Sequence, residues 1–290
     1  MARCSATTSR CSCCAAKSWR TIVSLPPIRK SLGQHFLRDA RALERIADAL
    51  ALTGHETVVE IGPGRGALTD LLRERSGRVV AIELDRMLAD VLTARYADDA
   101  RVRIVQADAL AIRLADVGGD EFVLVGNVPY YITTPLIFHA LERPRPLRSV
   151  FLVQREVAER LAAPPGGKEY GALSVNAQAI ADIELLFTVP ARAFLPPPKV
   201  ESAVVRMTPR DTPLISPDVE DRFKTFVLDI FGLRRKQMRR VLRTVLRLDA
   251  ERADEILRAE SIDPEARPET LTPAMIAALF QRIDASSGKT

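Results

Sequence analysis

Cysteine is confined to the first 14 of the 290 residues, and the remaining sequence has none. That remainder cannot form a disulfide framework, which is typical of proteins from a reducing compartment. Three of the cysteines, at positions 11, 13 and 14, are also too close together for the C-x2–4-C pairing of structural zinc sites. The three histidines lie in unrelated contexts, so the sequence predicts no metal site.

Long apolar runs are absent as well, since no stretch approaches the roughly 18 residues needed to cross a bilayer. We therefore expect no membrane partner. Acids are missing from residues 1–30, which carry six of the 42 bases and leave 36 bases against 37 acids in the rest. Because the formal net charge of +5 comes from this stretch, any nucleic-acid surface must come from local clusters of bases.

Residues 1–30 are rich in Arg and Ser, and we expect them to form a disordered or targeting tail. They lack the apolar core of a secretory signal. A bacterial cytoplasmic protein is favoured, with a mitochondrial location as the alternative if the tail is a transit peptide. A third interpretation places the true start nearer Val23.

Strands and helices alternate along the next part of the chain. Apolar strands are expected at 57–61, 78–83, 102–105, 121–126, 149–153, 182–189 and 201–208. Alternation with helices is typical of a parallel α/β sheet. A proline-containing linker at 209–218 then leads to an all-helical pattern. We therefore expect two domains after the tail, over residues 31–210 and 218–290.

A glycine-rich loop, Gly62-Pro63-Gly64-Arg65-Gly66, follows the first strand. Glycines let the backbone turn sharply and approach a ligand, and the next helix offers unpaired N–H groups. The spacing is G-x-G-x-G, not the G-x-G-x-x-G of dinucleotide-binding loops. Glu60, two residues earlier, suits the positive end of a cofactor. The loop resembles that of Rossmann-like S-adenosylmethionine-dependent methyltransferases, so we expect an α/β core of this class with a small all-helical C-terminal domain.

Polar residues follow the next three strands. Glu83 lies about 20 residues beyond the glycines, where an acid typically holds a ribose diol. Asp108 is placed to accept a hydrogen bond from an adenine amine, although alone it would be a solvated loop acid. Asp85 is the better candidate to cap the helix expected at 86–95. In open α/β sheets ligands bind beyond the carboxyl ends of the strands, so Glu83, Asp108 and Asn127 are expected to meet there.

The turn Asn127-Val128-Pro129-Tyr130 follows the fourth strand. Pro129 holds the preceding residue extended, and the Asn127 amide offers both an acceptor and donors. Tyr130 can stack on the face of a ring. The Asn127 carbonyl and the backbone carbonyl of Val128 or Pro129 can together accept the hydrogens of an exocyclic amine. Pattern alone more commonly marks an ordinary strand-ending turn.

A basic segment lies between Asp229 and Asp249, with seven bases and no acid. Met238 and Val241 are spaced to form a buried helix face, with the bases as a stripe on the other face. A solvated helix face is the ordinary interpretation, but a phosphate-binding ridge explains the lack of acids better. The predicted RNA-binding residues are Arg234, Arg235, Lys236, Arg239, Arg240 and Arg243.

Five segments in order resemble the small-subunit ribosomal RNA adenine N6,N6-dimethyltransferase family, over about residues 31–283. They are GQHFL (33–37), EIGPGRG (60–66), NVPY (127–130), FLPPPKV (194–200) and FGLRRK (231–236). The resemblance implies S-adenosylmethionine as the cofactor, contacted by His35, Leu37, Gly62, Glu83, Asp108 and Asn127. It implies a catalytic site formed by Asn127, Val128, Pro129, Tyr130 and Phe194. By pattern alone, Phe194 beside three prolines is a packed loop anchor.

The reaction implied by the resemblance dimethylates N6 of two adjacent adenosines in a hairpin near the 3′ end of small-subunit (16S-type) ribosomal RNA. The implied partner is this RNA within an immature small ribosomal subunit, and a monomer is expected. One alternative is a large-subunit adenine dimethyltransferase of the macrolide-resistance type. Another is a non-catalytic nucleic-acid-binding factor on the same fold. The long basic helical C-terminus favours the small-subunit type, and the complete set of polar residues at the strand ends argues against lost catalysis.

Overall fold

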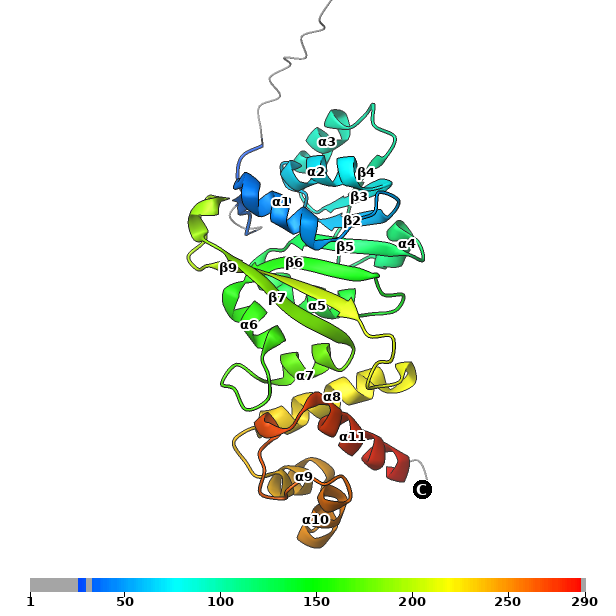
Figure 1. The fold of residues 1–290 in the computed structure, drawn as a ribbon, viewed down its shortest axis with the longest axis vertical. Coiled ribbons are helices and arrows are strands. Elements are labelled where there is room, and N and C mark those ends of the chain that lie inside the picture. Colours follow the sequence, from blue (N-terminus) through cyan, green and yellow to red (C-terminus); the bar gives the residue numbers. More distant parts are fainter. Residues whose placement is uncertain (1–25, 30–32, 288–290) are drawn as a thin grey trace, which may run out of the picture.

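The computed structural model describes residues 26–29 and 33–287. Figure 1 shows an elongated molecule, with the sheet and the helices that cover it in one part and the C-terminal helices at the other end. Most of the predicted tail, residues 1–30, lies outside the described residues. Within 26–29, Pro26 is buried and the Arg29 Nε lies 3.4 Å from an oxygen of Asp85. This short part of the stretch therefore packs against the folded chain.

Seven strands form one mixed sheet in the order β4-β3-β2-β5-β6-β9-β7. β2 lies between β3 and β5. The strands that follow β2 are added on one side of it as far as β4, and β5 is then added on its other side. Open α/β sheets bind ligands at such a switch point in strand order. Each expected strand is confirmed to within one residue at either end. The bounds are β2 (Thr57–Ile61), β3 (Arg78–Glu83), β4 (Val102–Gln106), β5 (Phe122–Asn127), β6 (Arg148–Gln154), β7 (Ala181–Val189) and β9 (Ser202–Pro209).

The expectation of a parallel sheet holds for β2 to β6 and is wrong for β7 and β9. β9 pairs antiparallel with both β6 and β7. Parallel neighbours need a long crossover connection, usually a helix. Residues 190–201 join β7 to β9 with only the short 3-10 helix η3 (Ala191–Ala193) and the two-residue strand β8 (Phe194–Leu195). The chain therefore returns beside β7 in the opposite direction.

Successive residues of the strands face two separate cores, because side chains alternate across a sheet. Val58 and Val123 pack on the side of α1 and α2, whereas Val59 and Leu124 pack on the side of α5 and α6. Asp85 caps α3 as expected, since its Oδ1 accepts a hydrogen bond from the Met87 backbone N at 3.0 Å. The helices here are α1 (Ala40–Ala49), α2 (Ala67–Arg75), α3 (Arg86–Arg95), α4 (Leu114–Gly118), α5 (Thr133–Ala140), α6 (Arg155–Ala162) and α7 (Ala172–Gln178).

The C-terminal part is all helical, as predicted, but its hydrophobic core is not confined to it. Val175 and Ala179, in and just after α7, belong to the same buried cluster as Phe223 and Met238. The Tyr170 hydroxyl also donates a hydrogen bond to the Leu271 carbonyl oxygen at 2.8 Å. The elements are η4 (Pro217–Val219), α8 (Glu220–Gly232), α9 (Met238–Leu246), α10 (Ala250–Ala259), η5 (Pro268–Thr270) and α11 (Pro273–Ser287).

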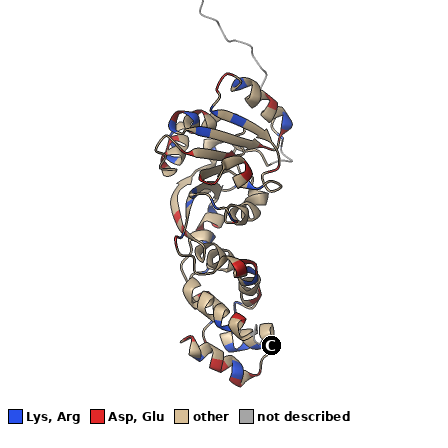
Figure 2. Cartoon of the chain, turned by 90° about the vertical axis from the view of Figure 1, so that its right-hand side faces the viewer, with Lys and Arg blue, Asp and Glu red and all other residues tan. Residues whose placement is uncertain are grey.

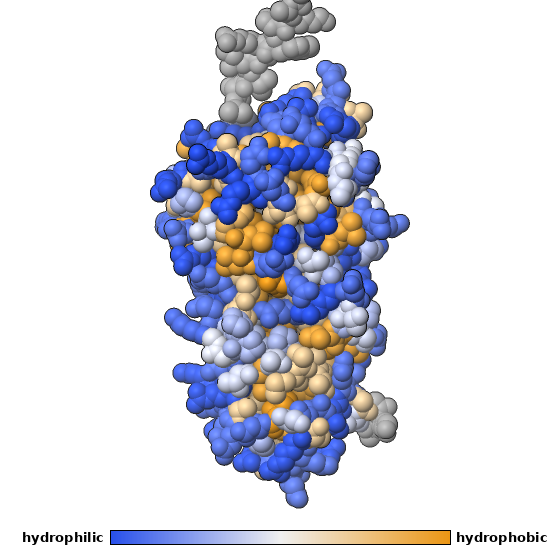
Figure 3. Space-filling view, in the orientation of Figure 1, coloured by the Kyte–Doolittle hydropathy of each residue, from blue (hydrophilic) through white to orange (hydrophobic). Residues whose placement is uncertain are grey.

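Figure 3 shows hydrophobic residues reaching one face of the molecule in two places, over the sheet and over the C-terminal helices, with hydrophilic residues around both. The division into domains over 31–210 and 218–290 stays a prediction. The buried cluster of the C-terminal helices also contains residues between 163 and 180, which lie in the first of these ranges. Across the part of the chain that the structure describes, no helix has the length and apolarity to span a bilayer.

Candidate active site

A cleft lies beyond the carboxyl ends of β2, β3, β4 and β5. Its empty space is about 840 Å³, including the part open to solvent. The structure brings eight of the predicted site residues to its walls, namely His35, Gly62, Glu83, Asp108, Asn127, Val128, Pro129 and Tyr130.

The glycine loop forms one wall because its backbone adopts a conformation that other residues rarely take. Gly62 has φ 70° and Gly64 has φ 57°, both in the left-handed region. A Cβ on Gly62 would lie 3.3 Å from the Asn127 carbonyl oxygen, and one on Gly64 would lie 2.8 Å from Phe36 Cδ1. Protein atoms thus approach both positions too closely for a side chain, so the loop keeps this path along Phe36 and Asn127 only with glycine.

Glu83 is buried at the end of β3, with both carboxylate oxygens facing backbone donors. Its Oε2 accepts a hydrogen bond from Gly64 N at 3.1 Å and its Oε1 accepts one from Asp85 N at 2.9 Å. Burial raises the pKa of this carboxyl, and the two backbone N–H groups oppose the rise. Each oxygen keeps a second lone pair. Glu83 therefore suits the predicted hydrogen bonds to a ribose diol.

Asp108 lies on the cleft wall just after β4, the strand beside β3, and is exposed. Its Oδ1 accepts a hydrogen bond from the Leu110 backbone N at 2.9 Å, which fixes the loop after β4. No residue of the described chain donates to its Oδ2. The predicted hydrogen bond to an adenine amine stays a prediction, and the carboxylate has an oxygen free to make it.

Asn127 has its side-chain amide oriented by the N-terminal segment. Its Nδ2 donates a hydrogen bond to the His35 carbonyl oxygen at 3.0 Å. A carbonyl oxygen only accepts, so the NH₂ group must face His35 and the Oδ1 must face away from it. Within residues 26–29 and 33–287 no group donates to that Oδ1. The amide therefore presents an unused acceptor at the cleft.

Tyr130 already has aromatic and polar partners. Its ring stacks on that of His35, with centroids 5.9 Å apart and planes at 23°, and its hydroxyl lies 2.7 Å from Ser202 Oγ. Burial raises the pKa of the phenol. His35 Nδ1 lies 2.8 Å from the Pro196 carbonyl oxygen, so Nδ1 carries the proton. These contacts join residues far apart in sequence into one wall of the cleft.

Leu37 and Phe194 do not line this cleft. They face each other across the two-residue antiparallel ladder of β1 (Phe36–Leu37) and β8, and both are buried in the core on the α1 side of the sheet. Leu37 lines a smaller adjoining hollow behind the glycine loop, whereas Phe194 lines neither. Phe194 thus occupies the position of a packed anchor, and its stacking on a base stays a prediction that would require it to leave the core.

Glu60 lies beside the glycine loop, as its place two residues before Gly62 indicates, but the sequence did not predict its burial. It is 1% exposed, lines the adjoining hollow, and accepts a hydrogen bond from Thr69 Oγ1 at 2.6 Å. Burial, with a smaller contribution from the carboxylates of Glu83 and Asp70, raises its pKa to about 8 against the lowering effect of Thr69. Near neutral pH this carboxyl is therefore largely protonated and neutral in the protein without ligand, and a positive ligand beside it would favour its ionised form.

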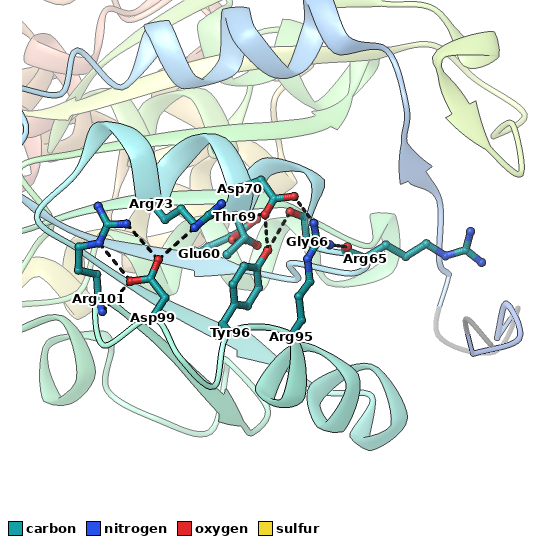
Figure 4. A network of polar contacts seen from close by, with 10 residues as sticks. All are labelled: Glu60, Arg65, Gly66, Thr69, Asp70, Arg73, Arg95, Tyr96, Asp99 and Arg101. Atoms are coloured by element: carbon teal, nitrogen blue, oxygen red, sulfur yellow. Dashed lines mark hydrogen bonds and ion pairs between the residues drawn. The ribbon is translucent and has the colours of Figure 1, made fainter. Parts of the chain in front are cut away.

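A polar network behind the loop holds this region in place, and Figure 4 shows its ten residues. The Tyr96 hydroxyl donates to Asp70 Oδ1 at 2.9 Å, and Arg95 forms an ion pair with the other Asp70 oxygen. Arg95 also donates to the Arg65 carbonyl oxygen at 3.0 Å. The network holds the C-terminal end of the glycine loop, through the carbonyl oxygens of Arg65 and Gly66. Its partners lie on α2 and α3, and the loop motif gave no signal of them.

The basic segment does not form the single helical stripe predicted from its sequence. Arg234, Arg235 and Lys236 lie in the turn between α8 and α9, because α8 ends at Gly232. Two of the bases are paired with acids from distant segments. Arg234 Nε lies 2.8 Å from Glu269 Oε2, and Arg239 forms a two-bonded ion pair with Asp254.

Four predicted RNA-binding bases keep exposed and unpaired side chains in the described part of the chain. They are Arg235, Lys236, Arg240 and Arg243. Figure 2 shows acidic and basic residues interspersed on the C-terminal helices. The basic surface is therefore smaller than the sequence predicts, although the RNA-binding role of its members remains a prediction.

The switch-point cleft, the glycine cradle and the acid at the end of β3 define a Rossmann-like, S-adenosylmethionine-dependent methyltransferase. The chain belongs to the ribosomal RNA adenine dimethylase family, which it matches over residues 27–285. It is 40% identical over 267 residues to the ribosomal RNA small subunit methyltransferase A of Geobacter metallireducens, covering 90% of this chain and 97% of that one. It is 43% identical over 250 residues to the enzyme of the same name from Xanthomonas campestris pv. campestris, covering 86% and 93%.

Solved structures agree with this fold. A dimethyladenosine transferase from Plasmodium falciparum superposes with a TM-score of 0.77 at 22% identity, over 87% of this chain and 98% of that one. The 23S rRNA methyltransferase ErmE superposes with a TM-score of 0.70 at 27% identity, over 86% and 99%. Both superpositions cover most of this chain, so the fold is shared with these two proteins.

Proposed function

We propose that this enzyme transfers methyl groups from S-adenosylmethionine to N6 of two adjacent adenosines in a 3′-terminal hairpin of small-subunit ribosomal RNA. The product is N6,N6-dimethyladenosine, made during ribosome biogenesis. Membership of the family and two relatives of at least 40% identity named for the small subunit support this substrate. The single structural observation that carries the chemistry is the orientation of the Asn127 amide by the His35 carbonyl.

The chemical problem is that the lone pair of adenine N6 is delocalised into the ring. S-adenosylmethionine supplies a methyl group already activated by its sulfonium charge. Asn127 Oδ1 would accept one N6 hydrogen and a backbone carbonyl would accept the other, so that the lone pair points at the methyl carbon. When the N–C bond forms, the C–S electrons remain on sulfur and N6 releases a proton to solvent. Orientation supplies much of the rate, so no strong general base is needed.

The second acceptor is the Val128 carbonyl rather than that of Pro129. The Pro129 oxygen already accepts hydrogen bonds from Ile132 N at 3.1 Å and Thr133 Oγ1 at 3.3 Å. No residue of the described chain donates to the Val128 oxygen. This distribution of hydrogen bonds makes Asn127 Oδ1 and the Val128 carbonyl oxygen the two acceptors proposed for the adenine amine.

Tyr130 would stack on the base drawn out of the RNA, and its bond to Ser202 together with its contact with His35 would hold the ring ready. Glu83, Asp108, His35, Leu37 and Gly62 would contact the cofactor, and Phe194 would complete the clamp on the base. We assign RNA docking to residues 218–290, chiefly through Arg235, Lys236, Arg240 and Arg243. The immature small subunit as the true substrate, a monomeric state and a cytoplasmic location are parts of the same proposal.

The main competing function is methylation of large-subunit RNA, as the name of ErmE states for that enzyme. Identity to ErmE is 27%, whereas identity to the two small-subunit relatives is 40% and 43%. The comparison favours the small subunit. The intact set at the strand ends favours an enzyme over a binding factor that has lost catalysis.

Methyl transfer from labelled cofactor to immature small subunits, large subunits and naked ribosomal RNA tests the proposal, with nucleoside analysis of each product. We expect dimethyladenosine in the small-subunit sample at two adjacent positions. Labelling of the large subunit in preference to the small one would select the ErmE-like alternative. Cofactor binding without methylation of any sample would select the binding factor.

A further inference from the structure

Tyr131 is a large aromatic residue exposed at the mouth of the cleft. Its side chain is 60% exposed, yet it lines the same cleft as Tyr130 and Asn127. In the described part of the chain its hydroxyl has no hydrogen-bond partner. Among the described residues, neither packing nor polar bonding accounts for a tyrosine here.

The position of Tyr131 is nevertheless fixed. It lies in the 3-10 helix η2 (Tyr130–Ile132), whose turn is closed by the bond from Ile132 N to the Pro129 carbonyl oxygen. A Cβ built on Gly33 would lie 3.6 Å from both Cδ1 and Cε1 of the Tyr131 ring. The ring therefore lies against the Gly33 backbone while most of it remains open to solvent.

Two neighbouring tyrosines thus have different surroundings at the same site. Tyr130 is half-buried, stacked on His35 and bonded to Ser202, whereas Tyr131 is held at the rim with an open surface. A base drawn from RNA into the cleft leaves its neighbour without a stacking partner, and unstacking costs free energy. Because one phosphate joins the two nucleotides, the neighbouring base must lie at the mouth of the cleft.

We propose that Tyr131 stacks on the adenosine adjacent to the one whose N6 lies in the cleft. The rim ring replaces the stacking lost on entry and holds the second adenosine next to the site, ready for its own methylation. This inference rests on the proposed function, because it requires an RNA substrate with adjacent adenosines. It assigns Tyr131 to substrate positioning, in contact with a base that is not reacting.

The test combines a protein change with an RNA change. Tyr131→Ala, Tyr131→Phe and the wild-type chain are compared in single-turnover methyl transfer on an RNA that is intact or lacks the base next to the first target. Stacking on an aromatic side chain is worth a rate or affinity factor of about 5 to 150 per base. We expect Tyr131→Ala to lose activity by a factor in this range on intact RNA and less than about twofold on the abasic RNA. Tyr131→Phe should stay within about twofold of wild type on both.

A second readout works without turnover. 2-Aminopurine at the adjacent position should lose fluorescence on binding the wild-type chain or Tyr131→Phe, and keep it with Tyr131→Ala. Equal losses on intact and abasic RNA, or quenching that survives Tyr131→Ala, would overturn the inference. Absence of methylation by the wild-type chain would instead refute the proposed function, and the fluorescence result would still decide whether Tyr131 stacks.

Discussion

The cleft and the basic segment are opposite kinds of site. Residues of the cleft are held by backbone partners, as Asn127 is by His35 and Glu83 by Gly64 and Asp85. In the basic segment, by contrast, Arg240 and Arg243 extend into solvent with no partner in the described chain. In the function we propose, methyl transfer depends on fixed side-chain orientation, whereas RNA docking depends on charges without a protein partner. Substitutions in the cleft should therefore lower turnover or cofactor affinity, whereas substitutions in the basic segment should lower RNA affinity.

The largest effect should come from Asn127→Ala. The single-turnover rate should fall by about 10²–10³, as for loss of one positioned polar group that acts in the transition state. RNA affinity, measured by filter binding, should stay within a few-fold. Asn127→Asp is the matched variant, because it keeps acceptor oxygens but cannot donate to the His35 carbonyl. An Asp variant with wild-type turnover would show that the link to His35 does not orient the site.

Glu83→Ala should act through the cofactor. Loss of a carboxylate that is hydrogen-bonded to a ribose diol should weaken cofactor binding by roughly 2–4 kcal/mol in calorimetry. RNA affinity should not change, since Glu83 is buried at the end of β3. If cofactor affinity is the same in wild type and variant, Glu83 only holds the Gly64 and Asp85 backbone.

The basic segment contains its own control for RNA binding, because arginines with and without an acidic partner lie on the same helix, α9. Changing Arg240 and Arg243 to Gln should reduce the slope of log affinity against log salt by about 0.7–0.9 per residue. Arg239→Gln is the control, since this arginine is bonded to Asp254. The control should keep the salt slope and lower the midpoint of thermal unfolding. The reverse pattern would place the RNA on the other face of α9.

Glu60 should have the smallest effect on turnover and a visible effect on stability. Its folded-state pKa of about 8 lies above the ordinary value of 4.5, so between these pH values the folded state keeps a proton that the unfolded state releases. Stability should therefore fall as pH rises from 4.5 to 8, and change little from this cause above pH 8. Glu60→Gln should flatten this dependence in urea unfolding at pH 5, 6.5 and 8. Parallel pH curves for the two proteins would mean that Glu60 is ionised throughout.

Local patterns predicted the cleft well. Apolar runs predicted the strand positions and glycine spacing predicted the loop, so the meeting of Gly62, Glu83, Asp108 and Asn127 followed from parallel strand topology. These features depend on residues near one another in sequence. The eight residues of the cleft that were expected from sequence and resemblance were therefore placed correctly at its walls, although their individual roles stay predictions.

Contacts between distant segments could not be predicted in the same way. The hydroxyl of Tyr130 meets Ser202, 72 residues later, and His35 meets Pro196, 161 residues later. Arg239 meets Asp254 only because α9 and α10 pack together, so a stretch free of acids in sequence is not free of acids in space. Phe194 follows the pattern of a packed anchor, and the structure places it there.

The core shared by α7 and the C-terminal helices has a consequence for recombination between family members. A crossover after residue 210 would separate Val175 and Ala179 from the side chains that cover them, and would remove the Leu271 carbonyl from Tyr170. Hybrids that exchange the C-terminal helices should fold only when residues 163–180 come from the same parent. The part of the chain that must be inherited as one unit is thus discontinuous, with one piece inside the methyltransferase sequence and one after it.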